Sequence, residues 1–242
     1  AMYSGTHVFD TDKNFQDQNP YWQFYKNSKL STAPPNYYNW LYKGHLFKFG
    51  NYYVGKPPPL FTLGFNPVEG AYFKYAFPLG YATPTYTIEL VPEFRYGLAD
   101  NAFKPSARLS FNFNPESPQK IEFSGGRQYR QFNTDEPILP VVNSLYSLFL
   151  GKNLIKLFGR DYIEANYSFE LLDAVSVNSS LEYARRYPLI NRSNFSFLYP
   201  NNVYEPNNQF TAATVADELV AEHRALNFSL GLSYQLGQLH QY

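Results

Sequence analysis

Strict alternation of apolar and polar side chains is the feature that most constrains how this chain can fold. Successive side chains of a β-strand point to opposite faces of a sheet, so each alternating run predicts a strand with one apolar and one polar face. The clearest run alternates a row of large apolar side chains with a row of small or polar ones, namely Leu226, Phe228, Leu230, Leu232, Tyr234 and Leu236 against Asn227, Ser229, Gly231, Ser233 and Gln235.

Comparable runs occupy residues 71–77, 87–96, 106–113, 121–129, 163–171 and 175–183, and a weaker one lies near residues 41–53. Together they give about eight strands of about ten residues, the length that a tilted strand needs to cross a bilayer. We therefore expect an all-β fold: a transmembrane antiparallel β-barrel, or a segment of a larger one, with helical insertions in long extracellular loops. A soluble aromatic-rich carbohydrate-binding β-sandwich is the alternative fold.

The connections between these runs alternate in length. Short ones are expected at residues 79–84, 114–119 and 172–174, and longer ones at residues 97–105, 133–159 and 186–222. Membrane barrels pair short periplasmic turns with longer outer loops, whereas a soluble sandwich has no physical reason to keep its long loops at one end. The alternation therefore favours a barrel.

Composition excludes several classes of protein. Lys and Arg together equal Asp and Glu at 20 each, which removes the basic footprint of a nucleic-acid-binding protein. The chain has no Cys, so it can form no disulfide and no thiolate metal site. A hydrophobic fraction of 44% argues against disorder, and no window contains the ~18 to 20 unbroken apolar residues of a membrane helix.

Aromatic residues make up 19% of the chain and gather near the strand ends. Two belts at the boundaries of a membrane would explain this placement, because Tyr and Trp prefer that boundary. The simpler alternative is that Tyr and Phe are good strand formers. The expected belt residues are Phe77, Tyr86, Phe113, Phe169 and Tyr234 at the short-turn end, and Tyr72, Tyr96, Tyr129 and Tyr183 at the long-loop end.

Three positions within the runs require a special explanation. Pro92 has no N–H to donate, so its strand should be bulged or locally unpaired. Lys74 and Arg95 must point inward, because an outward charge near the middle of a bilayer costs ~2 to 4 kcal/mol. Charges expected to meet and pair in the interior are Glu89, Glu93, Arg95, Arg108, Glu122, Arg127, Glu164, Glu170 and Glu182.

Several segments carry a more specific pattern. They read FNPVEG at residues 65–70, FN at 132–133 leading into PILPVVNSLY at 137–146, KLF at 156–158, SLEYARR at 180–186 followed by PL at 188–189, and LSY at 232–234 with GQ at 237–238. In these segments the chain resembles a family of outer-membrane β-barrel proteins of unknown function from Bacteroidota. Members of that family are often found with a carboxypeptidase-like regulatory domain and are described as similar to TonB-dependent receptors.

The resemblance covers residues from about 40 to the end, which divides the chain into an irregular N-terminal segment, residues 1–40, and a barrel segment of about eight strands, residues 41–242. It implies a bacterial outer-membrane location. It also implies that the first and last strands pair with the remaining strands of a larger barrel or with another outer-membrane subunit. Closure by about eight strands alone is the alternative.

Catalytic, cofactor and metal motifs are missing from the sequence. His7, His45, His223 and His240 are too scattered for a metal site, and no nucleophile elbow is present. The pair Gly125 and Gly126 lacks the Lys and the spacing of a phosphate-binding loop, so a bulge or a close interior approach is expected there. We therefore expect no catalytic residues, no cofactor and no metal.

Residues 133–159 form an unusually apolar loop in which Val141, Val142, Leu145, Leu148 and Phe149 recur at helical spacing. An apolar patch of this size is not expected to face water. The segment is therefore predicted to act as a lid that packs on its own barrel, with docking of a partner as the second possibility. A second helix is expected over residues 211–222.

Three arginines, Arg185, Arg186 and Arg192, lie close in sequence at the base of the last long loop. On the outside of a barrel they could donate charge-assisted hydrogen bonds to lipopolysaccharide phosphates. Ordinary solvation of a loop is the other interpretation.

The function expected from these observations is that of a non-enzymatic outer-membrane barrel protein, serving as a channel, a transport element or a scaffold subunit of a larger assembly. Its expected partners are outer-membrane lipid, lipopolysaccharide and neighbouring strands or subunits, and no nucleic acid. A barrel hydrolase acting at the outer rim is the alternative, and it requires a His within hydrogen-bond reach of Ser or Asp.

Overall fold

The computed structural model describes residues 44–113, 119–133, 138–172, 175–207 and 221–234. These residues form one antiparallel sheet of 11 strands, together with one short 3-10 helix and the α-helix α4, Pro140–Leu150. The predicted all-β fold is therefore confirmed, and so is a helix in the loop of residues 133–159. No helix in this part of the chain is both long and apolar enough to cross a membrane.

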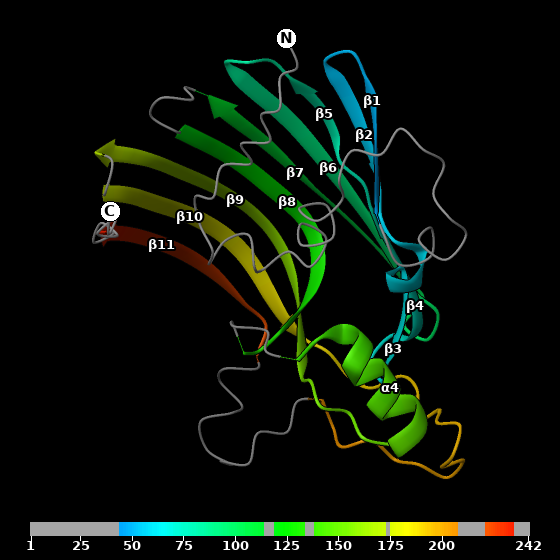
Figure 1. The fold of residues 1–242 in the computed structure, drawn as a ribbon. Coiled ribbons are helices and arrows are strands. Elements are labelled where there is room, and N and C mark those ends of the chain that lie inside the picture. Colours follow the sequence, from blue (N-terminus) through cyan, green and yellow to red (C-terminus); the bar gives the residue numbers. More distant parts are fainter. Residues whose placement is uncertain (1–43, 114–118, 134–137, 173–174, 208–220, 235–242) are drawn as a thin grey trace, which may run out of the picture.

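The strands are β1 His45–Phe49, β2 Tyr52–Lys56, β3 Leu63–Asn66, β4 Gly70–Ala76, β5 Leu79–Ala82, β6 Tyr86–Gly97, β7 Ala102–Phe113, β8 Gln119–Gln131, β9 Leu157–Leu172, β10 Val175–Pro188 and β11 His223–Tyr234. They pair in the order β1-β2-β5-β6-β7-β8-β9-β10-β11, and β3 and β4 extend the sheet beside β6. The sheet is a curved wall whose described ends, β1 and β11, are not paired with each other (Figure 1).

Three sequence expectations about strand boundaries are wrong. The single weak strand near residues 41–53 is a hairpin of β1 and β2, which turns at residues 50–51. Residues 79–82, expected to be part of a turn, form β5. The connection expected to be long at residues 97–105 is the short turn of residues 98–101, because β7 already begins at Ala102.

Pro92 lies where the neighbouring strand is interrupted. β4 pairs with β6 up to Ala76 opposite Glu93, and β5 pairs with β6 from Leu79 opposite Leu90. Phe77 donates a backbone hydrogen bond to the carbonyl of Pro92. The nitrogen and the carbonyl of a strand residue point to the same side, so the Pro92 nitrogen, which carries no hydrogen, also faces the gap between β4 and β5. The expected loss of pairing at Pro92 is confirmed, while pairing of β6 with β7 continues without a break.

The sheet has an exposed apolar outer face and a buried polar inner face. On the outer face of β11, Leu226 is 71% exposed and Leu232 is 73% exposed. On the inner face, Glu89 is 5% exposed and Glu122 is 3% exposed. No second sheet covers the apolar rows within the described residues, so the sandwich alternative is not the fold observed. The expected inward direction of Lys74 and Arg95 is also confirmed, since both line the inner cavity.

Like the sheet, α4 buries polar residues and exposes apolar ones. Its buried residues are Asn143, Ser144 and Ser147, whereas Leu145 is 52% exposed and Phe149 is 44% exposed. The expectation that this segment packs on its own barrel is met only in part, because Ile155 and Leu157 are buried whereas the apolar side chains of α4 other than Leu148 are exposed. The helix instead packs on β3 with its polar side, because those side chains bond to backbone groups that would otherwise be unpaired.

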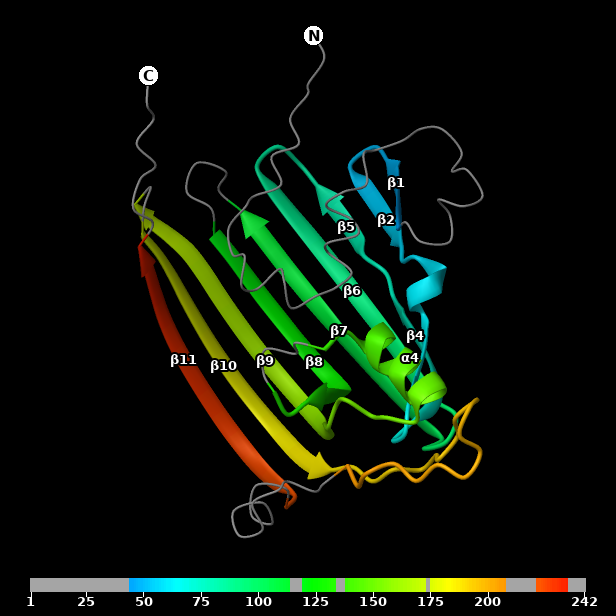
Figure 2. The ribbon, with the colours of Figure 1, turned by 60° about the horizontal axis from the view of Figure 1, so that its bottom comes forward.

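The segment that follows β10, residues 189–207, crosses the end of the sheet toward α4 (Figure 2). Phe197 donates its backbone N–H to the carbonyl of Leu148, and the Tyr204 hydroxyl donates to the carbonyl of Ser147. Leu189 of this segment packs with Val68, Ile155 and Leu157 in a small apolar cluster. The crossing segment and α4 together cover one end of the inner face.

Gly126 in β8 is required by a close approach of backbones. Its φ is 135°, and a Cβ built there would lie 2.4 Å from the carbonyl oxygen of Pro105 and 2.5 Å from the Cα of Ser106. We expect Gly126→Ala to lower the free energy of unfolding by roughly 2 to 4 kcal/mol, because neither backbone can move aside. Urea unfolding followed by circular dichroism in detergent measures the change.

Gly231→Ala in β11 is the matched control, since the closest atom to its built Cβ is the Asn178 oxygen at 3.9 Å. This substitution should change the free energy of unfolding by no more than about 0.5 kcal/mol. Equal effects of the two substitutions would contradict the close approach at Gly126.

Candidate functional site

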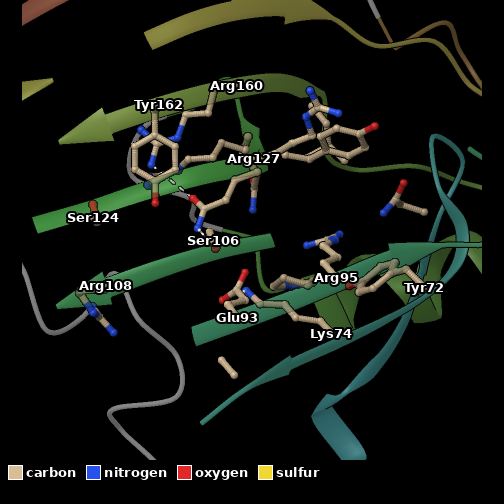
Figure 3. A pocket seen from close by; sticks show the side chains of 18 of the residues that line it. Tyr72, Lys74, Glu93, Arg95, Ser106, Arg108, Ser124, Arg127, Arg160 and Tyr162 are labelled. Atoms are coloured by element: carbon tan, nitrogen blue, oxygen red, sulfur yellow. Dashed lines mark hydrogen bonds and ion pairs between the residues drawn. The ribbon is translucent and has the colours of Figure 1, made fainter. Parts of the chain in front are cut away.

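The inner face lines an open cavity of about 310 Å³, and most of the residues that line it are polar or charged. Residues of six strands line it, among them Asn66 from β3, Lys74 from β4, Glu93 from β6, Arg108 from β7, Ser124 from β8 and Arg160 from β9 (Figure 3). This polar lining is the strongest candidate for a functional site in the described part of the chain.

Glu69 is the centre of the first charge network at this face. It lies in the turn between β3 and β4, where the Asn66 side chain accepts the backbone N–H groups of Val68 and Glu69 and donates to Glu69 Oε2 at 2.7 Å. The turn thereby directs the carboxylate inward, and Glu69 is fully buried. Arg95 and Lys104 are its two cationic partners, with Arg95 Nε at 2.8 Å and Lys104 Nζ at 2.9 Å from Oε1.

Two tyrosines extend this network. The guanidinium of Arg95 lies 4.0 Å from the ring centroid of Tyr72, and the Lys104 ammonium lies 4.3 Å from that of Tyr129. The Tyr129 hydroxyl donates to Asp100 at 2.8 Å, and Asp100 also pairs with Lys104 at 2.8 Å. Tyr72 and Tyr129 were expected in an outer aromatic belt, but their rings and the Tyr129 hydroxyl contact the buried cations and Asp100.

Burial raises the pKa of Glu69, but attraction from Arg95 and Lys104 and hydrogen bonds from Arg95 and Asn66 outweigh it. The net result is a pKa lowered from the usual 4.5 to about 2. Glu69 therefore stays ionised at neutral pH, and the network is a permanent ionic contact between the β3–β4 turn, β6 and β7.

Glu182 is the centre of a second network that joins β8 to β11. Arg160 and Arg186 both form ion pairs with its carboxylate, and Asn227 donates to it at 3.0 Å. Arg160 also donates to Gln128 at 3.3 Å and lies 3.8 Å from the ring centroid of Tyr162. Among the described residues, the Nε atoms of Arg160 and Arg186 have no hydrogen-bond acceptor. These two N–H groups could donate to a bound oxygen atom.

Between the two networks, one row across three strands carries opposite charges. Arg108 of β7 is paired in register with Ser124 of β8, and Ser124 with Glu164 of β9. Ser124 donates to Glu164 at 3.5 Å, a long hydrogen bond. The neighbouring charges are already neutralised, since Lys74 pairs with Glu93 at 3.1 Å and Lys120 with Glu122 at 3.0 Å.

Most of the charges expected in the interior are found there. Glu89 accepts a hydrogen bond from the Tyr53 hydroxyl at 2.7 Å, and Glu93, Arg95, Arg108, Glu122 and Glu164 line the cavity or its base. Arg127 also lines the cavity, but its side chain is 47% exposed and it pairs with Asp161 at 2.7 Å, a residue outside the expected set of charges (Figure 3).

The three arginines expected near lipopolysaccharide do not form one cluster. Arg185 and Arg186 are consecutive in β10 and therefore point to opposite faces. Arg185 is exposed and pairs with Glu222 at 2.8 Å, whereas Arg186 turns inward to Glu182. Arg192 is exposed in the crossing segment, where its backbone N–H donates to the carbonyl of Pro67.

The residues expected in the lid lie on one exposed side of α4. Val141, Val142, Leu145 and Phe149 are exposed, and Leu148 is half-buried. The predicted helix over residues 211–222 falls almost entirely outside the described residues. His7 and His240 also fall outside them, as does Leu236 of the last alternating run.

Neither described histidine contacts a potential catalytic partner. His45 packs against the ring of Phe47, with centroids 5.2 Å apart, and His223 Nδ1 lies 2.8 Å from the carbonyl of Ala221. The described residues also contain no group of His, Asp and Glu that could hold a metal ion.

Sequence reasoning missed Glu69, Lys104 and Arg160 as network residues. All three lie outside the alternating runs as read from the sequence, since strands β7 and β9 begin earlier than their apolar rows suggest. A signal for Glu69 did exist, because Asn66, Pro67 and Gly70 mark a turn that brings a carboxylate to a strand end.

Replacing Glu69 should be costly. We expect Glu69→Gln to lower the free energy of unfolding by about 3 to 5 kcal/mol, because it leaves Arg95 and Lys104 buried without their carboxylate. Urea unfolding in detergent at neutral pH measures the loss. Glu205→Gln is the control, since Glu205 is 85% exposed at its side chain and 3.6 Å from Lys156, and it should have little effect. A comparable loss in both variants would contradict the central place of Glu69.

The lowered pKa of Glu69 also predicts a dependence of stability on pH. The folded state binds this proton less readily than the unfolded state, so the stabilisation is complete above pH 4.5 and is lost as pH falls toward about 2. The acid midpoint of unfolding should therefore rise in Glu69→Gln, and the slope of stability against pH below 4.5 should become smaller. An unchanged slope would show that other carboxylates carry the acid sensitivity.

Comparison with known families gives one match. Residues 38–242 match the C-terminal domain of a family of unknown function, DUF5686. Comparisons with curated proteins and with solved structures give no match. Because the matched region covers most of the 242 residues and all of the described sheet, the chain belongs to the DUF5686 family, of whose proteins it contains the C-terminal domain.

Proposed function

We propose that this domain is part of the wall of a bacterial outer-membrane β-barrel and acts without catalysis, as a scaffold or transport element of a larger assembly. The observation that carries the proposal is the inverted sheet, with large apolar side chains exposed on one face and charges buried on the other. In water, such a face would cost free energy over the whole outer surface, whereas acyl chains would cover it without cost.

The form of the inner face favours a scaffold or a gated transport element over a permanently open channel. Ion pairs join neighbouring strands across it, as at Glu69 with Arg95 and at Glu182 with Arg160. The crossing segment and α4 cover one end. A wide aqueous pore would need free space where these contacts lie.

The unpaired sheet ends support a place within a larger barrel. β1 and β11 each have one strand neighbour within the described residues. An unpaired strand edge in lipid leaves backbone groups without hydrogen bonds, at several kcal/mol each. Further strands, of the same protein or of another subunit, would satisfy both edges. This proposed location fits the resemblance to outer-membrane proteins of Bacteroidota.

Contact with lipopolysaccharide remains part of the proposal for two of the three arginines. Arg185 and Arg192 are exposed near the end that carries α4 and the crossing segment, where the long connections gather. Guanidinium groups there could donate to lipid phosphates. Arg186 is a weaker candidate, because its guanidinium is engaged with Glu182 on the inner face.

The proposal is tested by placing a charge on each face of one strand. In the protein produced in a host with an outer membrane, Leu230→Lys should reduce the amount that fractionates with outer membranes and migrates in a heat-modifiable form. The physical reason is the cost of a lipid-facing Lys, ~2 to 4 kcal/mol near the middle of a bilayer.

Ser229→Lys is the matched control, because Ser229 is the adjacent residue on the other face of β11 and is also exposed. It should assemble at close to the native level. Fractionation of the unsubstituted protein as a soluble species without detergent would overturn the proposal, as would equal tolerance of Lys at both positions.

A further inference from the structure

α4 is a helix with no charged residue, and it exposes its apolar side. Residues 140–150 contain no Asp, Glu, Lys or Arg, and the side chains it exposes are apolar or Tyr. Surface helices of soluble proteins show the opposite arrangement, with the apolar stripe toward the core. This exposed apolar side is therefore not expected to face water.

The buried polar side of α4 seals a strand edge. Ser144 Oγ accepts the backbone N–H of Phe65 at 2.9 Å and lies 3.0 Å from the Phe65 carbonyl oxygen. Phe65 belongs to β3, whose one strand neighbour within the described residues is β4. One serine thus contacts both polar backbone groups of an edge residue, which a neighbouring strand would otherwise bond.

The rest of this polar side completes the bonding of the helix and the segment after it. Asn143 Oδ1 accepts the backbone N–H of Leu154 at 2.7 Å, and Ser147 Oγ donates to the carbonyl of Lys152 at 3.3 Å. These contacts hold α4 with its polar residues toward the protein. The apolar residues are consequently held away from it.

A chain of aromatic contacts connects the exposed side of α4 with the outer face of the sheet. Phe149 lies 5.5 Å from Phe197, Phe197 lies 5.1 Å from Phe195, and Phe195 lies 6.2 Å from Phe65, measured between ring centroids. Phe65 is paired in register with Ala71, one position from the inward Tyr72, so its side chain starts from the outer face. Phe65 itself is only 4% exposed, so the exposed apolar surface runs over the ring that packs on it, Phe195, which is 52% exposed, and from there to Phe197 and α4.

From this continuity we infer that the exposed side of α4, defined by Val141, Val142, Leu145 and Phe149, contacts lipid acyl chains at the boundary of the membrane. α4 lies beside β3, and β4 pairs with the last residues of β6, so the helix is near the end of the sheet and away from its middle. The inference rests on the proposed function and extends it from the strands to this helix. It makes α4 a seal that closes a strand edge against lipid.

A partner that adds a strand at this place fits less well. The N–H and C=O of Phe65, which such a strand would need, are already bonded to Ser144. Lipid requires a sealed edge, because unpaired backbone groups are costly in acyl chains. A covering protein or water at α4 is therefore an outcome that the experiment must be able to report.

Fluorescence quenching by lipid tests the inference, because the chain has no Cys and one introduced Cys gives a single labelling site. The variants Leu145→Cys, Leu230→Cys and Ser229→Cys are each labelled with a small fluorophore. They are then reconstituted in phosphatidylcholine vesicles that contain nitroxide-labelled phosphatidylcholine. We expect quenching at Leu145 of at least about half of that at Leu230, and little quenching at Ser229.

The three labelled positions distinguish a failure of the inference about α4 from a failure of the proposed function. Quenching at Leu230 without quenching at Leu145 overturns the inference and leaves the proposed function standing. A water-soluble quencher then distinguishes exposure to water from cover by protein at Leu145. Loss of quenching at Leu230 as well overturns the proposed function. Heat-modifiable migration confirms folding of each variant, and Phe149→Cys gives a second position on the same side of α4 if Leu145→Cys does not fold.

Discussion

The balance of charges on the inner face is the constraint on which the rest of this structure depends. Most large apolar side chains of the alternating runs point outward, so the inner face receives mainly the polar half of these runs. Charges buried together on this face must neutralise one another, because burial of an isolated charge is prohibitive. Two networks meet that requirement: Glu69 with Arg95 and Lys104 joins the β3–β4 turn to β6 and β7, and Glu182 with Arg160 and Arg186 joins β10 to β9.

Backbone groups impose a second constraint, at the places where strand pairing stops. The sheet is interrupted opposite Pro92, where the nitrogen could not have donated in any case. At β3 the edge is closed by Ser144 of α4. Pro92 needs no hydrogen-bond partner for its nitrogen, whereas the Ser144 side chain takes the place of a partner strand. Both keep unpaired backbone away from the apolar surface.

Much of the fold follows from alternation that is visible in the sequence. The apolar rows of β6, β7, β9, β10 and β11 were assigned to the correct face, because a period of two leaves only one choice once one face is apolar. The helix over Pro140–Leu150 was also predictable from spacing. Strand beginnings are not predictable in this way: Lys104 falls in the connection expected at residues 97–105, and Arg160 lies between the connection expected at residues 133–159 and the run that begins at residue 163.

The sequence by itself determined the strands, their two faces and the presence of a helix, because these depend on periodicity within about ten residues. The tertiary structure alone decided which charges meet and which side of α4 is buried. Pairing of Glu69 with Lys104 depends on a turn folding over a neighbouring hairpin, and burial of Ser144 depends on an open strand edge far away in the chain. Contacts of this kind are set by which strands become neighbours, and no local pattern of residues records that choice.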